Sequence, residues 1–415
     1  MSALQPARGT QDLLPETMRR HRRVSDTARR LAELYGFAEI ATPIFEFIEV
    51  FARPIGEHTD IVSKEMYTFT DRGGDELTLR PENTAGVVRA VISNGLTQST
   101  PLKFFYSGPM FRYERPQKGR FRQFHQIGVE ILGVAQPQAD IEIIELGHRI
   151  LKALGIADRV VLELNTLGDP ESRAAYRDAL VGYFTAHLAQ LSEDSRSRLQ
   201  RNPLRILDSK DAGDRRLIAD APDFADYLND ASRAFFARVR DGLTHLGISY
   251  QLNPRLVRGL DYYTHTVFEF VTTDLGAQGT VLAGGRYDGL VELMGGPSMP
   301  GVGWAAGIER LAMLIDDPPA SPRPVVLIPL GKAGEGAALK LGEELRDSGV
   351  VVELTYSGNL GRRMHRANRL NARAAVLLGD NELAQNSATL RDLDSGEQSL
   401  VPLAELAARL KAMAG

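Results

Sequence analysis

A long helical stretch in the middle of the chain limits the possible folds more than any other feature. From Pro170 to about residue 250, two segments look wholly helical, ESRAAYRDALVGYFTAHLAQLSEDSRSRLQRN and DAPDFADYLNDASRAFFARVRDGLTHLGI. Strand-rich sequence lies on both sides of this stretch. A helical block inside a strand-rich region predicts an insertion. We therefore expect the flanking parts, residues 1–169 and 251–318, to build one core together.

The flanking parts and the C-terminal part differ in their patterns. Residues 1–169 mix helices and strands, and the segment AEIATPIFEFIEVF is β-rich although Pro43 interrupts it. The polar, proline-rich stretch DDPPASPRPVV is typical of a linker. After it, residues 324–415 alternate strands with helices of about 10–15 residues, which predicts a small α/β domain with a partly parallel sheet.

Composition limits the kinds of site that the chain can build. The formal net charge is −4, so any contact with nucleic acid must come from local basic patches. The absence of cysteine excludes disulfides and thiolate zinc sites and fits a reducing cytoplasm. The eight histidines show no close pairing such as H-x-x-x-H, so we expect no metal site. We find no secretion signal and no apolar run long enough to span a membrane.

A basic hairpin carries a stronger local signal. The segment PMFRYERPQKGRFRQFHQIGVEILG, residues 109–133, places Arg112 on a strand beside a basic loop, ERPQKGR. A strand holds an arginine rigidly, and the planar guanidinium group binds phosphate through two hydrogen bonds. We interpret the strand as a phosphate site and the loop as a contact for a polyanion. The alternative is a solvated hairpin whose charges protect its edge.

Three further segments place polar groups among apolar residues. LTLRPENTAG holds Glu82 and Thr84 where a strand ends. LVRGLDYYTHTVFEF holds Arg258 and two tyrosines, which predicts a polar pocket or, alternatively, a buried tyrosine pair with an Arg–Asp bridge. GVGWAAGIERL carries Arg310 near a helix N-terminus, where the helix dipole and the guanidinium group both favour an anion. This segment has neither the Walker A nor the Rossmann glycine pattern.

A row of arginines marks the C-terminal part. Their spacing of i, i+4, i+7 and i+11 predicts one face of a helix near residues 360–371, and the four are Arg362, Arg366, Arg369 and Arg373. Like charges at this spacing destabilise an isolated helix, and such a face often meets nucleic-acid phosphates. The alternative is a solvated helix.

The order of these motifs is more specific than any one of them. FRYERPQKGRFRQFHQ, a helical insertion, RGLDYYTHTVFE, GGRYDGL and GVGWAAGIERL follow one another along the chain. In this order they resemble the histidyl-tRNA synthetase family of class II aminoacyl-tRNA synthetases, from ARGTQDLLP to an anticodon-binding type of C-terminal domain. The resemblance implies an α+β catalytic core, with an antiparallel sheet flanked by helices, and a homodimer with Pro43 at the subunit interface.

The resemblance also implies domain limits and an activity. The catalytic core would comprise residues 1–169 and 251–318, the insertion residues 170–250, and the anticodon-binding α/β domain residues 324–415. A cytoplasmic histidine–tRNA ligase of this family uses ATP and Mg²⁺ to convert histidine into histidyl-adenylate and releases pyrophosphate. It then transfers histidine to the 3′ end of tRNA(His).

Residues that match the family's motifs fall into four groups. The resemblance implies catalytic roles, as fixed charges around the α-phosphate, for Arg112, Arg258 and Arg310. It implies ATP contacts for Arg112, Glu114, Arg120, Phe124 and Arg310. It implies histidine contacts for Glu82, Thr84, Gln126, Glu130, Arg258, Tyr262, Tyr263 and Tyr287. It implies tRNA contacts for Gln117, Arg122, Arg362, Arg366 and Arg369.

Selectivity for histidine would follow from the two nitrogens of imidazole, one a donor and one an acceptor. A pocket with Glu130 on one edge and a tyrosine hydroxyl on the other can reject other amino acids by ~10⁴-fold, so we expect no editing domain. Two alternatives stay open. A non-catalytic regulatory subunit of ATP phosphoribosyltransferase tends to lack RGLDYY and the anticodon-binding domain, which are both present here. An amide-forming ligase on the same core would not need the arginine-faced terminal helix.

Overall fold

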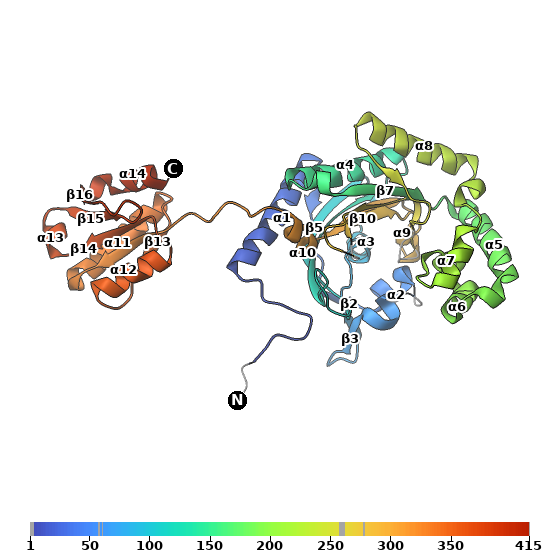
Figure 1. Ribbon diagram of the computed structural model, residues 1–415, viewed down its shortest axis with the longest axis horizontal. Coiled ribbons are helices and arrows are strands. Elements are labelled where there is room, and N and C mark those ends of the chain that lie inside the picture. Colours follow the sequence, from blue (N-terminus) through green and yellow to red (C-terminus); the bar gives the residue numbers. More distant parts are fainter. Residues whose placement is uncertain (1–3, 57–58, 60, 257–261, 277–278, 415) are drawn as a thin grey trace. The chain divides into compact units, whose positions relative to one another are not determined.

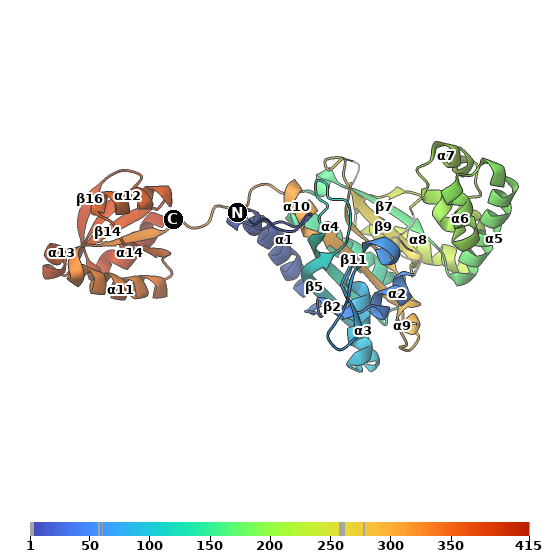
Figure 2. The same cartoon turned by 90° about the horizontal axis from the view of Figure 1, so that it is seen from below.

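The chain forms two units, and the boundary between Pro318 and Pro319 lies within the proline-rich stretch. The computed structural model describes residues 4–56, 59, 61–256, 262–276 and 279–414. Two views of it are given in Figure 1 and Figure 2. Each unit has its own sheet and its own core.

An eight-stranded sheet forms the centre of the first unit. Its strands are β1 (Ala38–Glu39), β5 (Leu102–Phe111), β6 (Gln123–Leu132), β7 (Val161–Thr166), β8 (Gln251–Leu252), β9 (Thr264–Val271), β10 (Thr280–Arg286) and β11 (Gly301–Gly307). They lie in the order β1-β5-β6-β11-β10-β9-β7-β8. All neighbours from β5 to β7 are antiparallel, while the edge strands β1 and β8 run parallel to β5 and β7. The predicted class of fold is therefore confirmed.

Helices cover one face of this sheet, as Figure 1 shows for α4 and α8. The covering helices are α1 (Pro15–Leu34), α4 (Pro137–Ala153), α8 (Asp230–His245) and α10 (Ile308–Leu314). Their apolar residues recur every three or four positions, and they pack on the apolar residues of the sheet. Val24 of α1, Ile143 of α4 and Leu311 of α10 are fully buried together with Ile127 and other β6 residues. None of the described helices is long and apolar enough to span a membrane.

A smaller, three-stranded sheet lies in the order β2-β4-β3 and is accompanied by short helices. Its elements are β2 (Phe45–Phe47), β3 (Tyr67–Thr70), β4 (Glu76–Leu79), α2 (Glu49–Ile55), α3 (Thr84–Ser93) and α9 (Leu290–Leu293). The segment AEIATPIFEFIEVF was expected to be β-rich, and this is only partly right, because its end belongs to α2. The spacing of the buried Phe51 and Ile55 explains the difference, since four residues bring side chains onto one face of a helix.

The predicted helical insertion contains α5 (Pro170–Ala186), α6 (Glu193–Arg201), α7 (Ala212–Ala219) and α8. The first three helices enclose a core of their own, which includes Leu180, Phe184 and Ile206. Helix α8 packs differently, because its residues Val239 and Leu243 belong to the core of the large sheet. The last helix of the block is therefore also part of the layer that covers the large sheet.

The second unit has a five-stranded sheet in the order β13-β12-β14-β15-β16, in which β12 is parallel to both neighbours. Its elements are β12 (Val325–Pro329), β13 (Val352–Leu354), β14 (Ala374–Leu378), β15 (Ser387–Asp392), β16 (Gln398–Pro402), α11 (Gly331–Asp347), α12 (Leu360–Arg369), α13 (Asp380–Ala384) and α14 (Leu403–Ala414). Alternate residues of β12 enter two separate cores, Val325 and Leu327 on one face and Val326 and Ile328 on the other.

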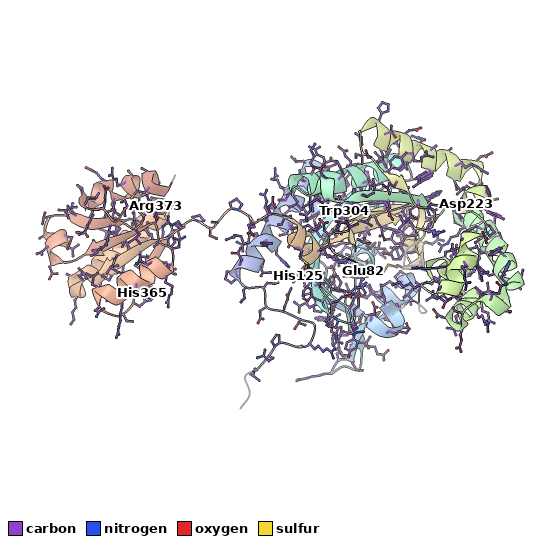
Figure 3. All side chains as sticks on the ribbon, viewed as in Figure 1. Glu82, His125, Asp223, Trp304, His365 and Arg373 are labelled. Carbon is purple, nitrogen blue, oxygen red and sulfur yellow. The ribbon has the colours of Figure 1, made fainter. Side chains whose placement is uncertain are left out.

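One residue of the predicted arginine row does not belong to it. Helix α12 ends at Arg369, and Arg373 lies beyond it, just before β14. Its guanidinium group donates to the Met413 carbonyl oxygen and to the Asp392 carboxylate, which lowers the pKa of Asp392. Figure 3 shows Arg373 near α14 and His365 on α12. The arginine spacing predicted a helix that includes Arg373. The helix ends earlier, and the backbone turns at Asn371, where φ is +51°.

Candidate functional site

A cavity of about 220 Å³ lies against the large sheet of the first unit. Its lining comes from β6, β10, β11 and α10, from the loop after β5, from the segment that joins β4 to α3, and from the residues just before β9. Residues that are far apart in the sequence meet here. Of the predicted site residues, the lining includes Glu82, Thr84, Arg112, Glu114, Arg120, Phe124, Gln126, Tyr262, Tyr263 and Arg310.

Main-chain carbonyl groups hold two arginines at one end of the cavity. Arg112 Nε donates to the Pro81 carbonyl oxygen at 2.9 Å, and Arg310 donates to the carbonyl oxygens of Gly119 and Thr280. Burial lowers the pKa of Arg310, and the neighbouring Arg120 lowers it further. Because carbonyl oxygens carry no net charge, these hydrogen bonds orient the guanidinium groups without neutralising them. This end of the cavity is therefore suited to an anion.

An aromatic ring and a carboxylate complete this end. The guanidinium carbon of Arg112 lies 5.4 Å from the centre of the Phe124 ring. Glu114 forms an ion pair with Arg120 at 2.6 Å, and one of its oxygens is 4.0 Å from Arg112. The flat ring beside fixed cations offers a stacking surface next to a phosphate-binding group, which is an arrangement suited to a nucleotide.

Alternation along β6 decides which residues face the cavity. Phe124 and Gln126 line it, while Ile127 is buried on the helix-covered face. The Gln126 side-chain oxygen is buried and has no hydrogen-bond partner among the described residues. A buried acceptor without a donor is costly, so this atom marks a place where a ligand donor would be stabilised.

A buried polar network adjoins the cavity. Glu82 accepts hydrogen bonds from the main-chain N–H groups of Thr84 and Ala85 at the start of α3, and burial raises its pKa. The fully buried Glu130 accepts hydrogen bonds from the Thr84 hydroxyl at 2.7 Å and from the Tyr287 hydroxyl. Burial raises the pKa of Glu130 to about 8, although these hydrogen bonds oppose the change. Glu130 is therefore mostly protonated, and uncharged, at neutral pH.

Glycine makes room for this network. A Cβ atom at Gly303 of β11 would overlap the Glu130 carboxyl group, and one at Gly128 would overlap the Tyr106 ring. Tyr106 pairs with Gly128 across β5 and β6, and its hydroxyl lies 3.5 Å from Glu130 Oε1. The sequence prediction missed Tyr106, since it stands in an apolar strand segment. Its pairing with a glycine depends on strand register.

The remaining predicted residues lie elsewhere. Glu130 and Tyr287 are buried next to the cavity lining, and Arg258 lies outside the described residues. Gln117 is exposed on the hairpin loop, whereas Arg122 is half-buried with its guanidinium carbon 3.7 Å from the centre of the Tyr113 ring. The three arginines of α12 belong to the second unit. Arg362 and Arg369 are exposed, and Arg366 lies 3.6 Å from Glu353.

Comparison with known proteins gives consistent matches over both units. The chain matches the family model of histidyl-tRNA synthetase over residues 9–311 and that of an anticodon binding domain over residues 324–413. It is 63% identical over 407 residues to the histidine–tRNA ligase of Rhodospirillum rubrum, with 98% of each chain covered. It is 60% identical over 415 residues to that of Gluconacetobacter diazotrophicus, with 100% of each covered. The structure is similar to that of apo S. aureus histidyl-tRNA synthetase, with a TM-score of 0.84 and 35% identity, covering 99% of this chain and 100% of that one.

Proposed function

The chain belongs to the histidyl-tRNA synthetase family of class II aminoacyl-tRNA synthetases and has histidine–tRNA ligase activity; from this premise we propose which of its residues carry out each step. The main support is the cavity of the first unit. It combines two oriented guanidinium groups with a buried acceptor that has no partner among the described residues. We assign the former to ATP and the latter to the ammonium group of histidine.

In the first step the histidine carboxylate attacks the α-phosphorus of ATP, and pyrophosphate leaves. Both reactants are anions, so fixed positive charge must bring them together and stabilise the charge that develops on the phosphoryl oxygens. We assign this role to Arg112 and Arg310, whose carbonyl partners hold them in place before substrate binds. Arg258 matches the family's additional arginine and completes the set. Phe124 would stack on adenine, and Glu114 and Arg120 would orient the nucleotide and its outer phosphates.

Magnesium fits this cavity in a limited way. Mg²⁺ prefers carboxylate, phosphate and water oxygens. Among the residues that we assign to ATP, Glu114 supplies a carboxylate, and Arg120 already pairs with it. We propose that phosphate oxygens and water supply most of the ligands, with Glu114 beside them. Bound in this way, Mg²⁺ would neutralise phosphate charge.

We propose that the buried network selects histidine. The ammonium group would donate to Gln126 Oε1 and to the Glu82 carboxylate. The main-chain N–H of Thr84 donates to the same carboxylate and orients it, and lone pairs remain for the ligand. The neutral carboxyl group of Glu130 would meet one imidazole nitrogen, with Tyr287 and Thr84 fixing its orientation. Tyr262 and Tyr263 would form the walls. An amino acid without two ring nitrogens would leave these buried groups unpaired, which explains selectivity without editing.

In the second step a ribose hydroxyl at the 3′ end of tRNA(His) attacks the adenylate. We propose that the exposed Gln117 and the partly covered Arg122 of the hairpin contact the acceptor end. The helical insertion, residues 170–250, would hold the acceptor stem, and the second unit would bind the anticodon stem-loop. On α12 the contacts to tRNA phosphates would come from the exposed Arg362 and Arg369 and from the half-buried Arg366.

We also propose a homodimer that acts in the cytoplasm, where ATP and tRNA are available. Four large apolar side chains on or beside the three-stranded sheet are 43–55% exposed, namely Ile44, Phe45, Phe47 and Phe69. Pro43 is exposed next to them. Such a group of apolar residues is typical of a protein interface. Light scattering on the full chain should give the mass of two chains, and Phe45→Asp with Phe47→Asp should reduce it to one.

Pyrophosphate exchange with each of the 20 amino acids tests the function directly. We expect exchange with histidine alone, and charging of tRNA(His) in the presence of ATP. The alternative, a regulatory subunit of ATP phosphoribosyltransferase, predicts no exchange with any amino acid. The relatives at 58–63% identity over nearly the full chain are named histidine–tRNA ligases, and this favours the enzyme.

A further inference from the structure

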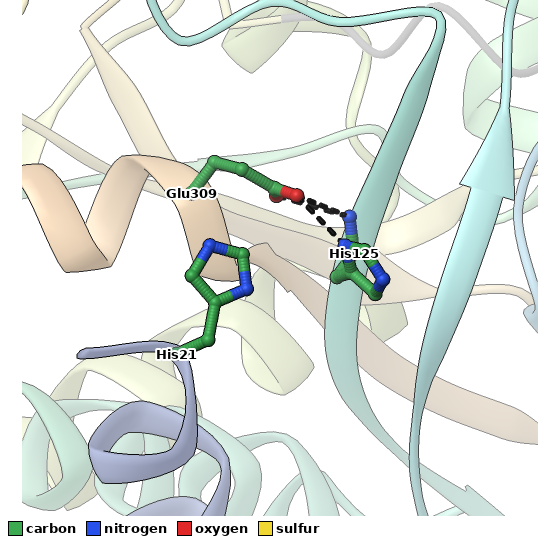
Figure 4. A group of neighbouring side chains, drawn as sticks. All are labelled: His21, His125 and Glu309. Atoms are coloured by element: carbon green, nitrogen blue, oxygen red, sulfur yellow. Dashed lines mark hydrogen bonds and ion pairs between the residues drawn. The ribbon is translucent and has the colours of Figure 1, made fainter. Parts of the chain in front are cut away.

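A second polar cluster adjoins the cavity and shares Glu309 with its lining. It consists of His21 from α1, His125 from β6 and Glu309 from α10, and Figure 4 shows the three side chains turned toward one another. Each residue offers one ligand atom, and these atoms all lie within 4.8 Å of one another. Strand alternation places His125 opposite Phe124 and Gln126, which face the cavity.

We propose that His21, His125 and Glu309 bind a divalent transition-metal ion of the zinc type. Two imidazoles and one carboxylate form a donor set that zinc accepts in proteins when a fourth position is left to water. Soft sulfur ligands are absent, so the site would not suit Cu(I). Magnesium and calcium are poorly suited as well, since they prefer oxygen ligands alone.

The cluster is already close to the geometry that such an ion requires. Ligand atoms at about 2.0–2.1 Å from a tetrahedral zinc ion are roughly 3.3 Å from one another. Here His125 Nδ1 lies 2.8 Å from Glu309 Oε1, and the two histidine rings have their centres 5.6 Å apart at an angle of 81°. A small movement of His21 toward this pair would complete the site. The histidine nitrogens that bind the ion must carry no proton.

Burial and charge point to a cation here. His21 is 4% exposed and Glu309 5% exposed. Within the described part of the chain, the Glu309 carboxylate has an ion-pair contact with His125 and with no lysine or arginine. A buried carboxylate is costly unless positive charge compensates it, and no lysine or arginine among the described residues does so here. A divalent ion would supply the missing charge.

The backbone holds the carboxylate in position. Both oxygens of Glu309 lie 3.0 Å from the main-chain nitrogen of His125, which donates to them. A carboxylate has about four lone-pair positions, so acceptor capacity is left for a metal. Such supporting hydrogen bonds orient metal ligands in known sites.

The site would connect α1 to two elements that also line the cavity, β6 and α10. His125 stands between Phe124 and Gln126, and Glu309 precedes Arg310. An ion bound to the cluster would fix α1 and α10 to β6 behind the residues that we assign to ATP. The inference concerns binding and stability. It does not depend on the proposed function, because its test contains neither ATP nor histidine.

Equilibrium dialysis of the full chain, without a histidine tag and after chelator treatment, tests the proposal. We expect one zinc ion per chain at about 10 μM free Zn²⁺, and a rise in Tm of about 5 °C when zinc is present at 100 times its Kd. His21→Asn should weaken zinc binding by at least 10-fold and abolish the rise in Tm. The matched control is His148→Asn on α4, a half-buried histidine outside the cluster, which should bind zinc like the unchanged chain.

Cobalt provides a readout that does not depend on the variants folding well. Co²⁺ bound to these ligands should give visible absorption bands of a four- or five-coordinate ion, and an equivalent amount of Zn²⁺ should remove them. The proposal is overturned if the unchanged chain binds no zinc at 100 μM. It is equally overturned if His21→Asn binds zinc as tightly as His148→Asn. The cluster would then be no zinc site, but a hydrogen-bonded pair of His125 and Glu309 beside His21.

Discussion

Arginines in the two units differ in how the protein holds them. In the cavity, Arg112 and Arg310 are partly buried, and carbonyl oxygens fix their guanidinium groups. On α12, Arg362 and Arg369 are exposed to solvent. Fixed, partly buried charge is little screened by salt and stabilises charge that develops at one point. Exposed charge acts over a wider surface and weakens as salt is added. We therefore expect one residue type to serve local catalysis in one unit and polyanion binding in the other.

Removing a fixed arginine should have the largest effect. Arg310→Ala should lower histidine-dependent pyrophosphate exchange by about 10³-fold, because an oriented charge next to the transferring phosphoryl group is lost. Affinity for tRNA should change little. Arg258→Ala should act similarly. Exchange kinetics and a filter-binding assay measure the two properties, and Arg362→Ala is the control that should leave exchange unchanged. Normal exchange by Arg310→Ala would contradict the role that we assign to it.

Filling the space beside Glu130 should have the next largest effect. In Gly303→Ala the new methyl group would overlap the Glu130 carboxyl group, so the histidine pocket must shift. A displacement of about 1 Å can cost about 100-fold in rate, and we expect kcat/KM for histidine in the exchange reaction to fall by about this factor. Gly182→Ala on α5 is the control, because a Cβ atom there meets nothing within 4 Å. Equal kinetics for the two variants would show that the pocket tolerates the methyl group.

Reversing the half-buried charge of Arg366 on α12 should have a smaller effect, confined to tRNA. Arg366→Glu should weaken tRNA binding by about 10-fold at low salt and reduce the salt dependence of the binding constant by about one phosphate contact. Histidine-dependent exchange should not change. Arg391→Glu on β15 makes the same charge reversal at an exposed position elsewhere in the second unit and should have little effect. If both variants lose affinity equally, binding depends on net charge and not on α12.

The smallest predicted effect concerns pH. Glu130 has a pKa of about 8 when folded, against 4.5 as an ordinary value. Below pH 4.5 both states carry the proton. Between 4.5 and about 8 the unfolded chain releases it while the folded chain keeps it, so the free energy of unfolding falls as pH rises. From pH 6 to pH 7 the loss should be about 1 kcal/mol.

Glu130→Gln tests this pH dependence, because glutamine resembles the protonated carboxyl group and cannot titrate. Urea unfolding can be followed through the fluorescence of Trp304, the single tryptophan, which is buried in the first unit. The variant should show a flatter dependence of stability on pH between 5 and 8 than the unchanged chain. Identical slopes would mean that Glu130 is ionised in the folded protein and that its surroundings are more polar than its burial indicates.

Local sequence patterns were enough to predict much of this protein. Hydrophobic periodicity and the proline-rich stretch indicated the class of fold and the helical block, because both depend on residues that are near one another in the chain. The side chains that β6 turns toward the cavity were predictable too, since alternation on a strand is a local property. Phe124 and Gln126 follow this rule.

Tertiary structure decided the features that depend on which segments become neighbours. Tyr106 joins the Glu130 network through its pairing with Gly128, and strand register sets that pairing. Arg373 does not lie on the predicted arginine face, because α12 ends at Arg369. The histidines carried no metal-type spacing in the sequence, yet α1, β6 and α10 bring two of them to one carboxylate. Spacing along a chain determines the faces of single elements, whereas only packing determines which faces meet.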